Sequence, residues 1–136
     1  MIFKDNLTSV SLTELIAATN WQQQYRLIIQ WGKLIQPKPA LRLPENLVKG
    51  CELPVWLVHE REGEQHYFLF DSDSSVMNGL VVLLLVQLNG KSAAQIRELD
   101  IAASIKLFGF DKHLTPSRNN GFRRILERAL HLVDMQ

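Results

Sequence analysis

The only cysteine of the chain, Cys51, is the residue with the clearest capacity for covalent chemistry. An ionised thiol is the strongest nucleophile among protein side chains. Gly50 permits backbone conformations that other residues avoid, while Pro54 holds Leu53 extended and delays strand pairing until Val55. We therefore expect Cys51 in an irregular loop before a strand, where reactive groups are often displayed. A buried structural cysteine fits the local sequence about equally well.

Other polar residues indicate a site less directly. Asp71 and Asp73 stand where a strand should end and a helix begin, so capping explains them better than a catalytic carboxylate pair. Arg118 lies in the first turn of an expected helix, where the helix dipole disfavours a cation, which favours a tertiary or partner role. The histidines lack paired ligand spacing, and one cysteine cannot build a thiolate cage, so we expect no metal and no cofactor. These histidines are His59, His66, His113 and His131.

The composition excludes several classes of protein. With 136 residues, 46% hydrophobic and 21% charged, we expect one soluble globular domain spanning residues 1–136. The 15 basic residues are scattered and the net charge is +1, so we expect neither a nucleic-acid nor a membrane partner. No apolar core follows Lys4 and Asp5 as in a signal peptide, and the apolar run 79–86 is too short to span a bilayer. The lone cysteine favours a cytoplasmic protein.

Local signals predict helices around one hairpin. Start signals at Ser11 and Asn20 predict a short helix and then an amphipathic helix that ends before Pro37. Residues 45–49 are expected to form a helical turn. Residues 55–59 and 65–70 predict an antiparallel hairpin with a charged turn over 60–64, one face on helices and the other partly wet.

The second half of the chain is predicted to be helical. Caps within residues 71–74 begin a helix from about Ser75 to Leu88, which is apolar almost all round and should be the central, most buried one. Two short helices are expected over about 93–99 and 101–108. Thr115 then caps a last helix.

Gly50-Cys51 followed by Val55-Trp56-Leu57 resembles the active-site segment of the SufE/CsdE family of sulfur acceptors. Three further segments resemble that family, and they follow in the family's order across about residues 21 to 126. They are Trp21, Tyr25, Ile28 and Gly32-Lys33-Leu34 in the N-terminal helix, Asp71-Ser72-Asp73 with Gly79-Leu80 at the strand-to-helix junction, and His113-Leu114-Thr115-Pro116-Ser117-Arg118 with Gly121 at the last helix start. No segment is specific alone, but four in this order and spacing are.

The resemblance implies both a fold and a function. The fold would be α+β, a small antiparallel sheet packed on one side by helices, with a third strand that the sequence does not reveal. The protein would accept persulfide sulfur on Cys51 from a PLP-dependent cysteine desulfurase of the SufS or CsdA type and stimulate it, for iron–sulfur cluster assembly. It would be an accessory protein, not an enzyme, and a downstream scaffold would follow it. IscU-type scaffolds, similar in fold, hold clusters with several cysteines, so this chain should carry sulfur instead.

The resemblance also assigns roles to residues around Cys51. It implies that Arg118 faces the desulfurase, that Asp71 and Asp73 lie near the cysteine loop, and that Glu52 belongs to the partner-binding surface. Family members usually carry small polar residues after Gly-Cys and often Lys or Arg at the position of Asn78. Lys49 or Arg118 would favour the thiolate, and Glu52 would oppose it. The sequence leaves open which is nearer.

Two other functions fit the same residues. Cys51 would serve a cysteine hydrolase if one of His59, His66 or His113 lay within hydrogen-bond reach of its sulfur. The chain would alternatively be a non-reactive adaptor that binds through its apolar surface.

Overall fold

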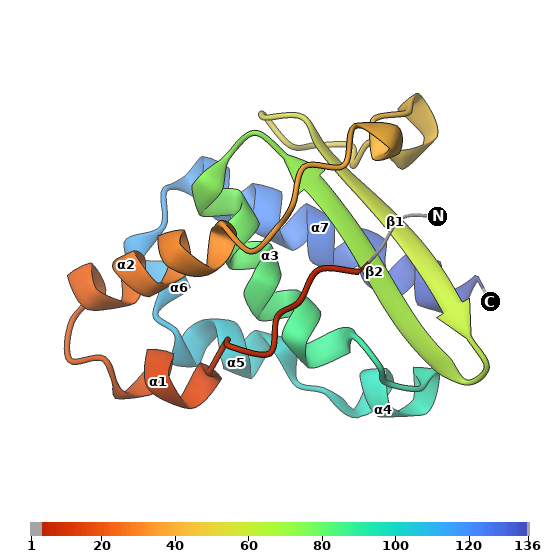
Figure 1. Cartoon of the computed structure of the whole chain (residues 1–136). Helices are drawn as coiled ribbons and strands as arrows, with labels where there is room; N and C mark the ends of the chain where they lie inside the picture. The colour runs from red at the N-terminus through yellow and green to blue at the C-terminus, as the bar shows by residue number, and fades with distance from the viewer. Residues whose placement is uncertain (1–3, 136) are drawn as a thin grey trace.

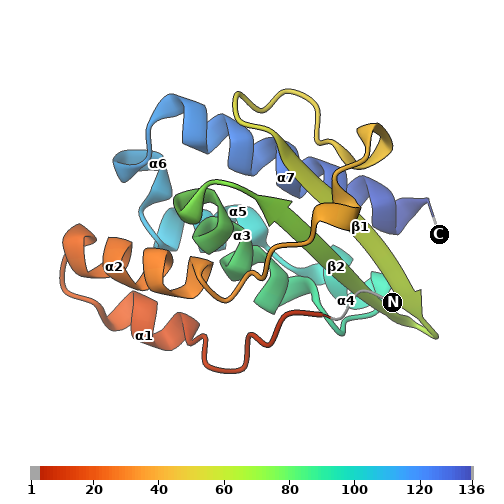
Figure 2. The same cartoon turned by 45° about the horizontal axis from the view of Figure 1, so that its top comes forward.

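The protein is built around a β-hairpin that lies across long α-helices, as Figures 1 and 2 show. The computed structural model describes residues 4–135, except the side chains of Ile105, Leu107 and Asp111. Strand β1 packs against α7, strand β2 packs against α3, and α2 packs against α3 as well. The elements are α1 (Leu12–Ala17), α2 (Trp21–Gly32), the 3₁₀ turns η1 (Pro39–Leu41) and η2 (Pro44–Asn46), β1 (Val55–Glu62), β2 (Gln65–Ser72), α3 (Ser75–Leu88), α4 (Ala93–Glu98), α5 (Ile101–Leu107), α6 (Phe110–His113) and α7 (Pro116–Asp134). The predicted α+β class is confirmed.

Helix α3 forms the centre of the core, as its continuous apolar sequence predicts. Every side chain from Leu80 to Leu85 is at most 2% exposed. The helix has the predicted bounds, Ser75–Leu88, because Ser74 Oγ accepts a hydrogen bond from the Met77 amide at 3.1 Å and so ends the preceding strand segment. A helix buried on all sides needs neighbours on all sides, and α2, α7 and β2 supply them.

Helices α2 and α3 cross with their backbones in contact, because each has a glycine at the crossing. A Cβ atom on Gly79 would lie 2.0 Å from the Ile28 carbonyl oxygen, and one on Gly32 would lie 2.3 Å from the Ser75 carbonyl oxygen. No side chain fits at either position without moving the helices apart.

Start signals predicted most of the other helices correctly. The side chains of Asn20 and Thr115 each accept a hydrogen bond from the amide three residues on, and Ser92 begins a capping box. The differences lie at helix ends. Helix α2 already ends at Gly32, η2 replaces the turn expected over 45–49, and α6 was not predicted.

The hairpin is longer and its turn tighter than the sequence predicts. Strand β1 continues to Glu62 instead of ending at His59, and only Gly63 and Glu64 form the turn. Gly63 has a φ of 61°, which two-residue hairpin turns require at their first central position. The predicted turn over 60–64 is therefore wrong, and the charged residues before Gly63 belong to the strand pairing.

The predicted third strand is also wrong, because the described residues form a sheet of two strands. One bridging pair lies beyond each edge: Leu47 bridges to Trp56, and His66 bridges to Lys91. Gly50 has a φ of 89° and turns the chain soon after the first of these pairs. Pairing on that edge therefore does not extend into a strand.

The outer face of β2 is covered, not partly wet as predicted. Leu69 is 1% exposed and Asp71 is 2% exposed. The connector 36–42 explains this burial, since Lys38 Nζ donates a hydrogen bond to the Phe70 carbonyl oxygen at 3.2 Å. The sequence did not show that this proline-containing connector returns over the sheet.

Two histidines share a hydrogen bond near the turn of the hairpin. His59 Nε2 lies 2.7 Å from His66 Nδ1, and their rings stack with centroids 4.9 Å apart. Burial lowers the pKa of both below the ordinary value of 6.5, and the charge of Arg61 lowers both further. Each ring also faces other charges: His66 lowers the pKa of His59, Arg97 lowers that of His66, and Glu64 raises it. The neutral pair is the form that the fold favours.

We expect the protein to lose stability as the pH falls from about 7 to about 5. Because both pKa values are lower in the folded chain, the unfolded chain binds more protons below about pH 6.5. His59→Gln removes one titrating group and keeps a polar neighbour for His66. Urea unfolding at several pH values should therefore show a shallower pH dependence of the free energy of unfolding for the variant. Equal slopes for the two proteins would contradict this.

Candidate functional site

Cys51 lies in the loop between η2 and β1, against the N-terminal half of α7. Two contacts with α7 fix its place: Asn120 Nδ2 donates a hydrogen bond to the Gly50 carbonyl oxygen at 2.8 Å, and Cys51 Sγ lies 3.7 Å from the Gly121 carbonyl oxygen. The positive φ of Gly50 directs the chain into this contact. The thiol is half-buried, so it is neither a core cysteine nor a fully exposed one.

Glycines allow the loop and the helix to approach this closely. A Cβ atom on Gly50 would lie 3.0 Å from Arg124 Nε, within the space that this side chain now fills. A Cβ atom on Gly121 would lie 3.9 Å from Cys51 Sγ and 3.0 Å from Met77 Cε. The sulfur therefore lies close to α7 at Gly121, and Met77 in the first turn of α3 packs against the same glycine.

Burial sets the protonation of Cys51. Removal from water raises the pKa of the thiol, and the positive charge of Arg124 lowers it by a smaller amount. Arg124, rather than Lys49 or Arg118, is thus the cation that acts on this thiol. In this conformation the thiol is protonated at neutral pH and is a poor nucleophile until its surroundings change.

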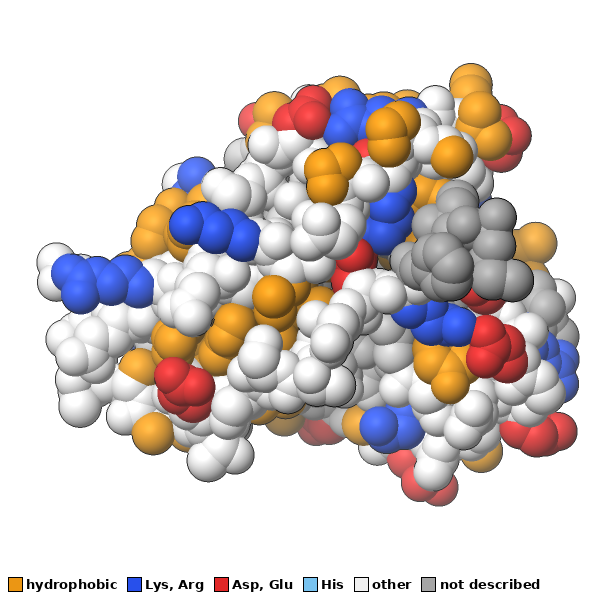
Figure 3. Space-filling model, in the orientation of Figure 1, with side chains coloured by type: hydrophobic (Ala, Val, Ile, Leu, Met, Phe, Trp, Pro, Cys, Tyr) orange, Lys and Arg blue, Asp and Glu red, His pale blue; other side chains and the backbone are white. Residues whose placement is uncertain are grey.

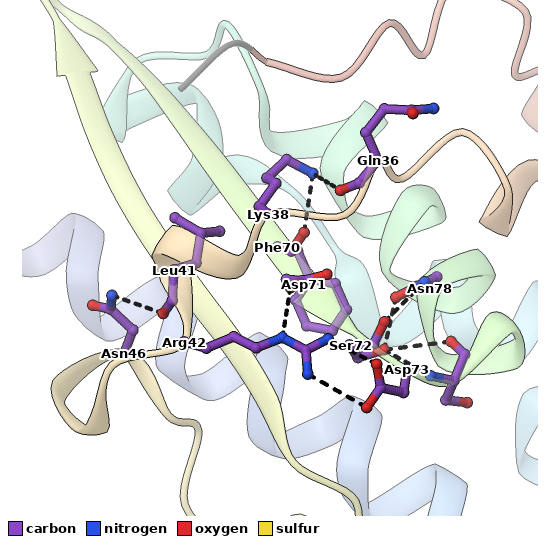
Figure 4. A network of polar contacts seen from close by, with 11 residues as sticks. Gln36, Lys38, Leu41, Arg42, Asn46, Phe70, Asp71, Ser72, Asp73 and Asn78 are labelled. Atoms are coloured by element: carbon purple, nitrogen blue, oxygen red, sulfur yellow. Dashed lines mark hydrogen bonds and ion pairs between the residues drawn. The ribbon is translucent and has the colours of Figure 1, made fainter. Parts of the chain in front are cut away.

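Asp71 and Asp73 hold a cation and do not cap α3, so the capping interpretation is wrong. Arg42 Nε lies 2.8 Å from Asp71 Oδ2, and Arg42 Nη2 lies 2.8 Å from Asp73 Oδ1 (Figure 4). The guanidinium also lies 4.5 Å from the centroid of the Trp56 ring. Hydrogen bonding to Arg42, and then its charge, holds the pKa of Asp73 below 3.8. Ser74 provides the cap instead.

The same junction contains a serine–asparagine pair, seen beside Asp73 in Figure 4. Ser72 Oγ donates to Asn78 Oδ1 at 2.7 Å and accepts from the Ser74 amide at 3.2 Å. Asn78 therefore links the first turn of α3 to the end of β2.

The structure brings the predicted residues together only in part. Arg118 is half-buried and stands two residues before Asn120 on α7, while Glu52 is exposed beside Cys51. Asp71 and Asp73 contact Arg42, and Cys51 Sγ forms no hydrogen bond to either of them among the described residues.

Sequence reasoning missed three residues of this region. Arg42 gave no signal, because it stands in a connector among prolines. Asn120 and Arg124 lie in a helix whose early turns contain Asn119-Asn120-Gly121, three poor helix formers in succession. Such a run is unfavourable within a helix, which indicates that these residues are needed for a contact with another segment of the chain.

The histidines lie away from the thiol. His59 and His66 bind one another, and His113 stacks on Trp21 with ring centroids 4.8 Å apart. Within residues 4–135, no histidine nitrogen forms a hydrogen bond with Cys51 Sγ. No group of three or more His, Cys, Asp or Glu residues in the described chain is arranged to hold a metal ion. Nor is any described helix both long and apolar enough to cross a membrane.

Comparisons with known proteins identify the family of the chain and its fold. The family model for SufE, the Fe-S metabolism associated domain, matches residues 10–133. An uncharacterised SufE-like protein from Rhizobium etli is 33% identical over 123 residues, which cover 86% of this chain and 82% of that protein. The solution structure of a hypothetical protein from Thermus thermophilus has the same fold, with a TM-score of 0.74, 19% identity, and coverage of 91% of this chain and 90% of the other. The chain belongs to the SufE family, whose domain is associated with Fe–S metabolism.

Proposed function

We propose that the protein accepts sulfur on Cys51 from the persulfide of a PLP-dependent cysteine desulfurase and stimulates that enzyme. In this step the Cys51 thiolate attacks the outer sulfur of the donor persulfide. A new S–S bond forms at Cys51 Sγ, the donor's S–S bond breaks, and the donor cysteine leaves as a thiolate. The protein is an accessory carrier in the cytoplasm, where thiols stay reduced, and a downstream iron–sulfur scaffold receives the sulfur.

The observation that carries this proposal is the environment of the one thiol. Cys51 is half-buried beside Gly121, and burial raises the pKa of its sulfur, so stray electrophiles meet a protonated and shielded group. A carrier needs this protection, because a persulfide exposed to other thiols would lose its sulfur. Membership of a family associated with Fe–S metabolism supports the same reading.

A cysteine hydrolase is less well supported, because among the described residues no histidine bonds to Cys51 Sγ. A non-reactive adaptor would use exposed apolar side chains such as Leu43 and Leu53, which are 47% and 56% exposed. Alkylation by iodoacetamide separates the adaptor from the carrier. A carrier cysteine should be alkylated slowly in the free protein and much faster once the desulfurase is bound, whereas an adaptor cysteine should stay inert in both cases.

The direct test is the mass of the protein after incubation with a cysteine desulfurase, PLP and cysteine. One sulfur atom should be added, about 32 Da, and a thiol reductant should remove it. If no cognate desulfurase of either type adds this mass, the protein is not a sulfur acceptor.

Arg118 is expected to contribute to desulfurase binding. Arg118→Glu should weaken the affinity several-fold, because a half-buried cation at the start of α7 stands close in sequence to the residues that hold the Cys51 loop. Calorimetric titration measures this, with circular dichroism as the check on folding. Arg97→Glu, on the distant helix α4, is the control for the charge change, and it also removes the exposed ion pair of Arg97 with Asp134. Equal affinities for both variants would leave Arg118 an ordinary surface residue.

A further inference from the structure

A groove beside the Cys51 loop is not used by the proposed transfer step. It lies between the segment around η2 and an outer face of α7, and its volume is about 720 Å³. We call it the basic groove. Its lining includes Leu47, Lys49, Arg124, Glu127, Arg128 and His131.

The groove has an excess of positive charge. Lys49, Arg124 and Arg128 face two carboxylates, Glu45 and Glu127. Of the three cations, only Arg124 has an ion-pair partner among the described residues, Glu127 at 3.2 Å. Among the described residues, Lys49 and Arg128 are therefore left with one unpaired carboxylate, Glu45, so the groove keeps one net positive charge to attract an anionic group. Arg124 and Arg128 lie four residues apart on the same face of the helix.

Arg128 has a donor with no acceptor. Its Nε atom is buried and has no hydrogen-bond partner in the described structure, and its Nη2 atom reaches only the Glu45 carbonyl oxygen, at 3.4 Å. A buried N–H group without an acceptor destabilises the free protein. A carboxylate in the groove would satisfy Nε and Nη2 together once the guanidinium turns out toward the groove, with the two-point geometry that arginine favours.

The groove is joined physically to the reactive loop. The side chain of Arg124 lines the groove and also packs against Gly50, next to Cys51. Leu43 and Leu47, at the same segment, are 47% and 38% exposed. Figure 3 shows hydrophobic side chains beside Lys and Arg side chains, with Asp and Glu side chains among them, along the top edge of the view, where Figure 1 places the segments that precede β1. An occupant of the groove would therefore meet both charge and apolar surface.

We propose that the basic groove binds an acidic segment of the sulfur-donating desulfurase, with a carboxylate on Arg128 and apolar side chains against Leu47. This inference rests on the proposed function and adds the chemistry of the partner's surface. Contact with Arg124 would connect occupation of the groove to the loop that carries Cys51.

Calorimetric titration of a cysteine desulfurase into variants of the full chain tests the groove. Arg128→Glu should weaken binding by about ten-fold or more. Raising sodium chloride from about 0.05 to about 0.5 M should lower the affinity of wild type for the desulfurase more than that of the variant. Lys49→Glu, in the segment before Cys51, should also weaken binding of the desulfurase. Arg123→Glu is the control, since it makes the same charge change at an exposed position of α7 outside the groove lining.

Two outcomes would overturn the proposal, and they differ. If Arg128→Glu and Lys49→Glu bind as tightly as Arg123→Glu while wild type still gains sulfur on Cys51, the groove is not the docking surface and the proposed function stands. If wild type neither binds a desulfurase nor gains sulfur, the proposed function fails, and the partner assigned to the groove fails with it.

Discussion

Cys51→Ser is expected to abolish sulfur acceptance completely, so that the gain of about 32 Da seen with wild type and a cysteine desulfurase is absent. Only a thiol among these side chains holds sulfane sulfur, and the chain has one cysteine. Serine is close to cysteine in size, and its hydroxyl still reaches toward the Gly121 carbonyl oxygen that Cys51 Sγ now faces at 3.7 Å. The loop should therefore keep its conformation while its chemistry is lost.

Intact-mass spectrometry measures the transfer, and calorimetry shows whether Cys51→Ser still binds the desulfurase. Binding should persist, because Arg118 and the residues of the loop are unchanged. Thermal unfolding of the variant should match that of wild type, which excludes misfolding as the reason for the loss. Sulfur gained equally by the serine variant would show that Cys51 is not the acceptor.

Helices could be predicted from the sequence because their signals are local. Ser74, Thr115 and Asn20 each act on an amide three residues away, so a short window of sequence contains both partners. The apolar run of α3 likewise predicts burial without knowledge of its neighbours, since an element apolar on all sides has to be covered on all sides.

Errors arose where the partner is distant in sequence. The capping explanation for Asp71 and Asp73 was wrong because Arg42, about 30 residues earlier, returns over the sheet to bind both. The Cys51 loop depends on Asn120 and Arg124, about 70 residues later, and no local pattern links them to it. Spacing along the chain predicted the reactive residue but not its environment, which follows from how α7 packs.

The errors in predicting the sheet also arose from features that a short window of sequence does not contain. Whether a strand continues depends on a turn that matches the register of both strands, and the φ of 61° at Gly63 decides this for β1. A third strand needed a partner segment that stays extended, and the positive φ of Gly50 prevents this after Leu47. The bend at Gly50 both prevents a third strand and brings Cys51 to α7.

Gly79→Ala is expected to destabilise the protein by roughly 3 kcal/mol or more. The added Cβ atom would lie 2.0 Å from the Ile28 carbonyl oxygen and 2.6 Å from Ile28 Cγ2. Alanine favours a helix over glycine by about 1 kcal/mol, but the clash is with the backbone of α2, which cannot turn aside as a side chain does. The crossing helices must therefore separate, and this opens voids around α3.

Urea unfolding of Gly79→Ala against Gly121→Ala isolates the cause, since both changes add one methyl group to a buried helical glycine. At Gly121 the nearest atom is Met77 Cε at 3.0 Å, the flexible end of a side chain that is free to shift. Gly121→Ala should therefore retain most of the stability, whereas Gly79→Ala should lose a large fraction of a total that is about 5–15 kcal/mol for proteins of this kind. A loss within about 1 kcal/mol for Gly79→Ala would mean that α2 and α3 adjust their crossing freely, and the close approach at Gly32 would then not be required.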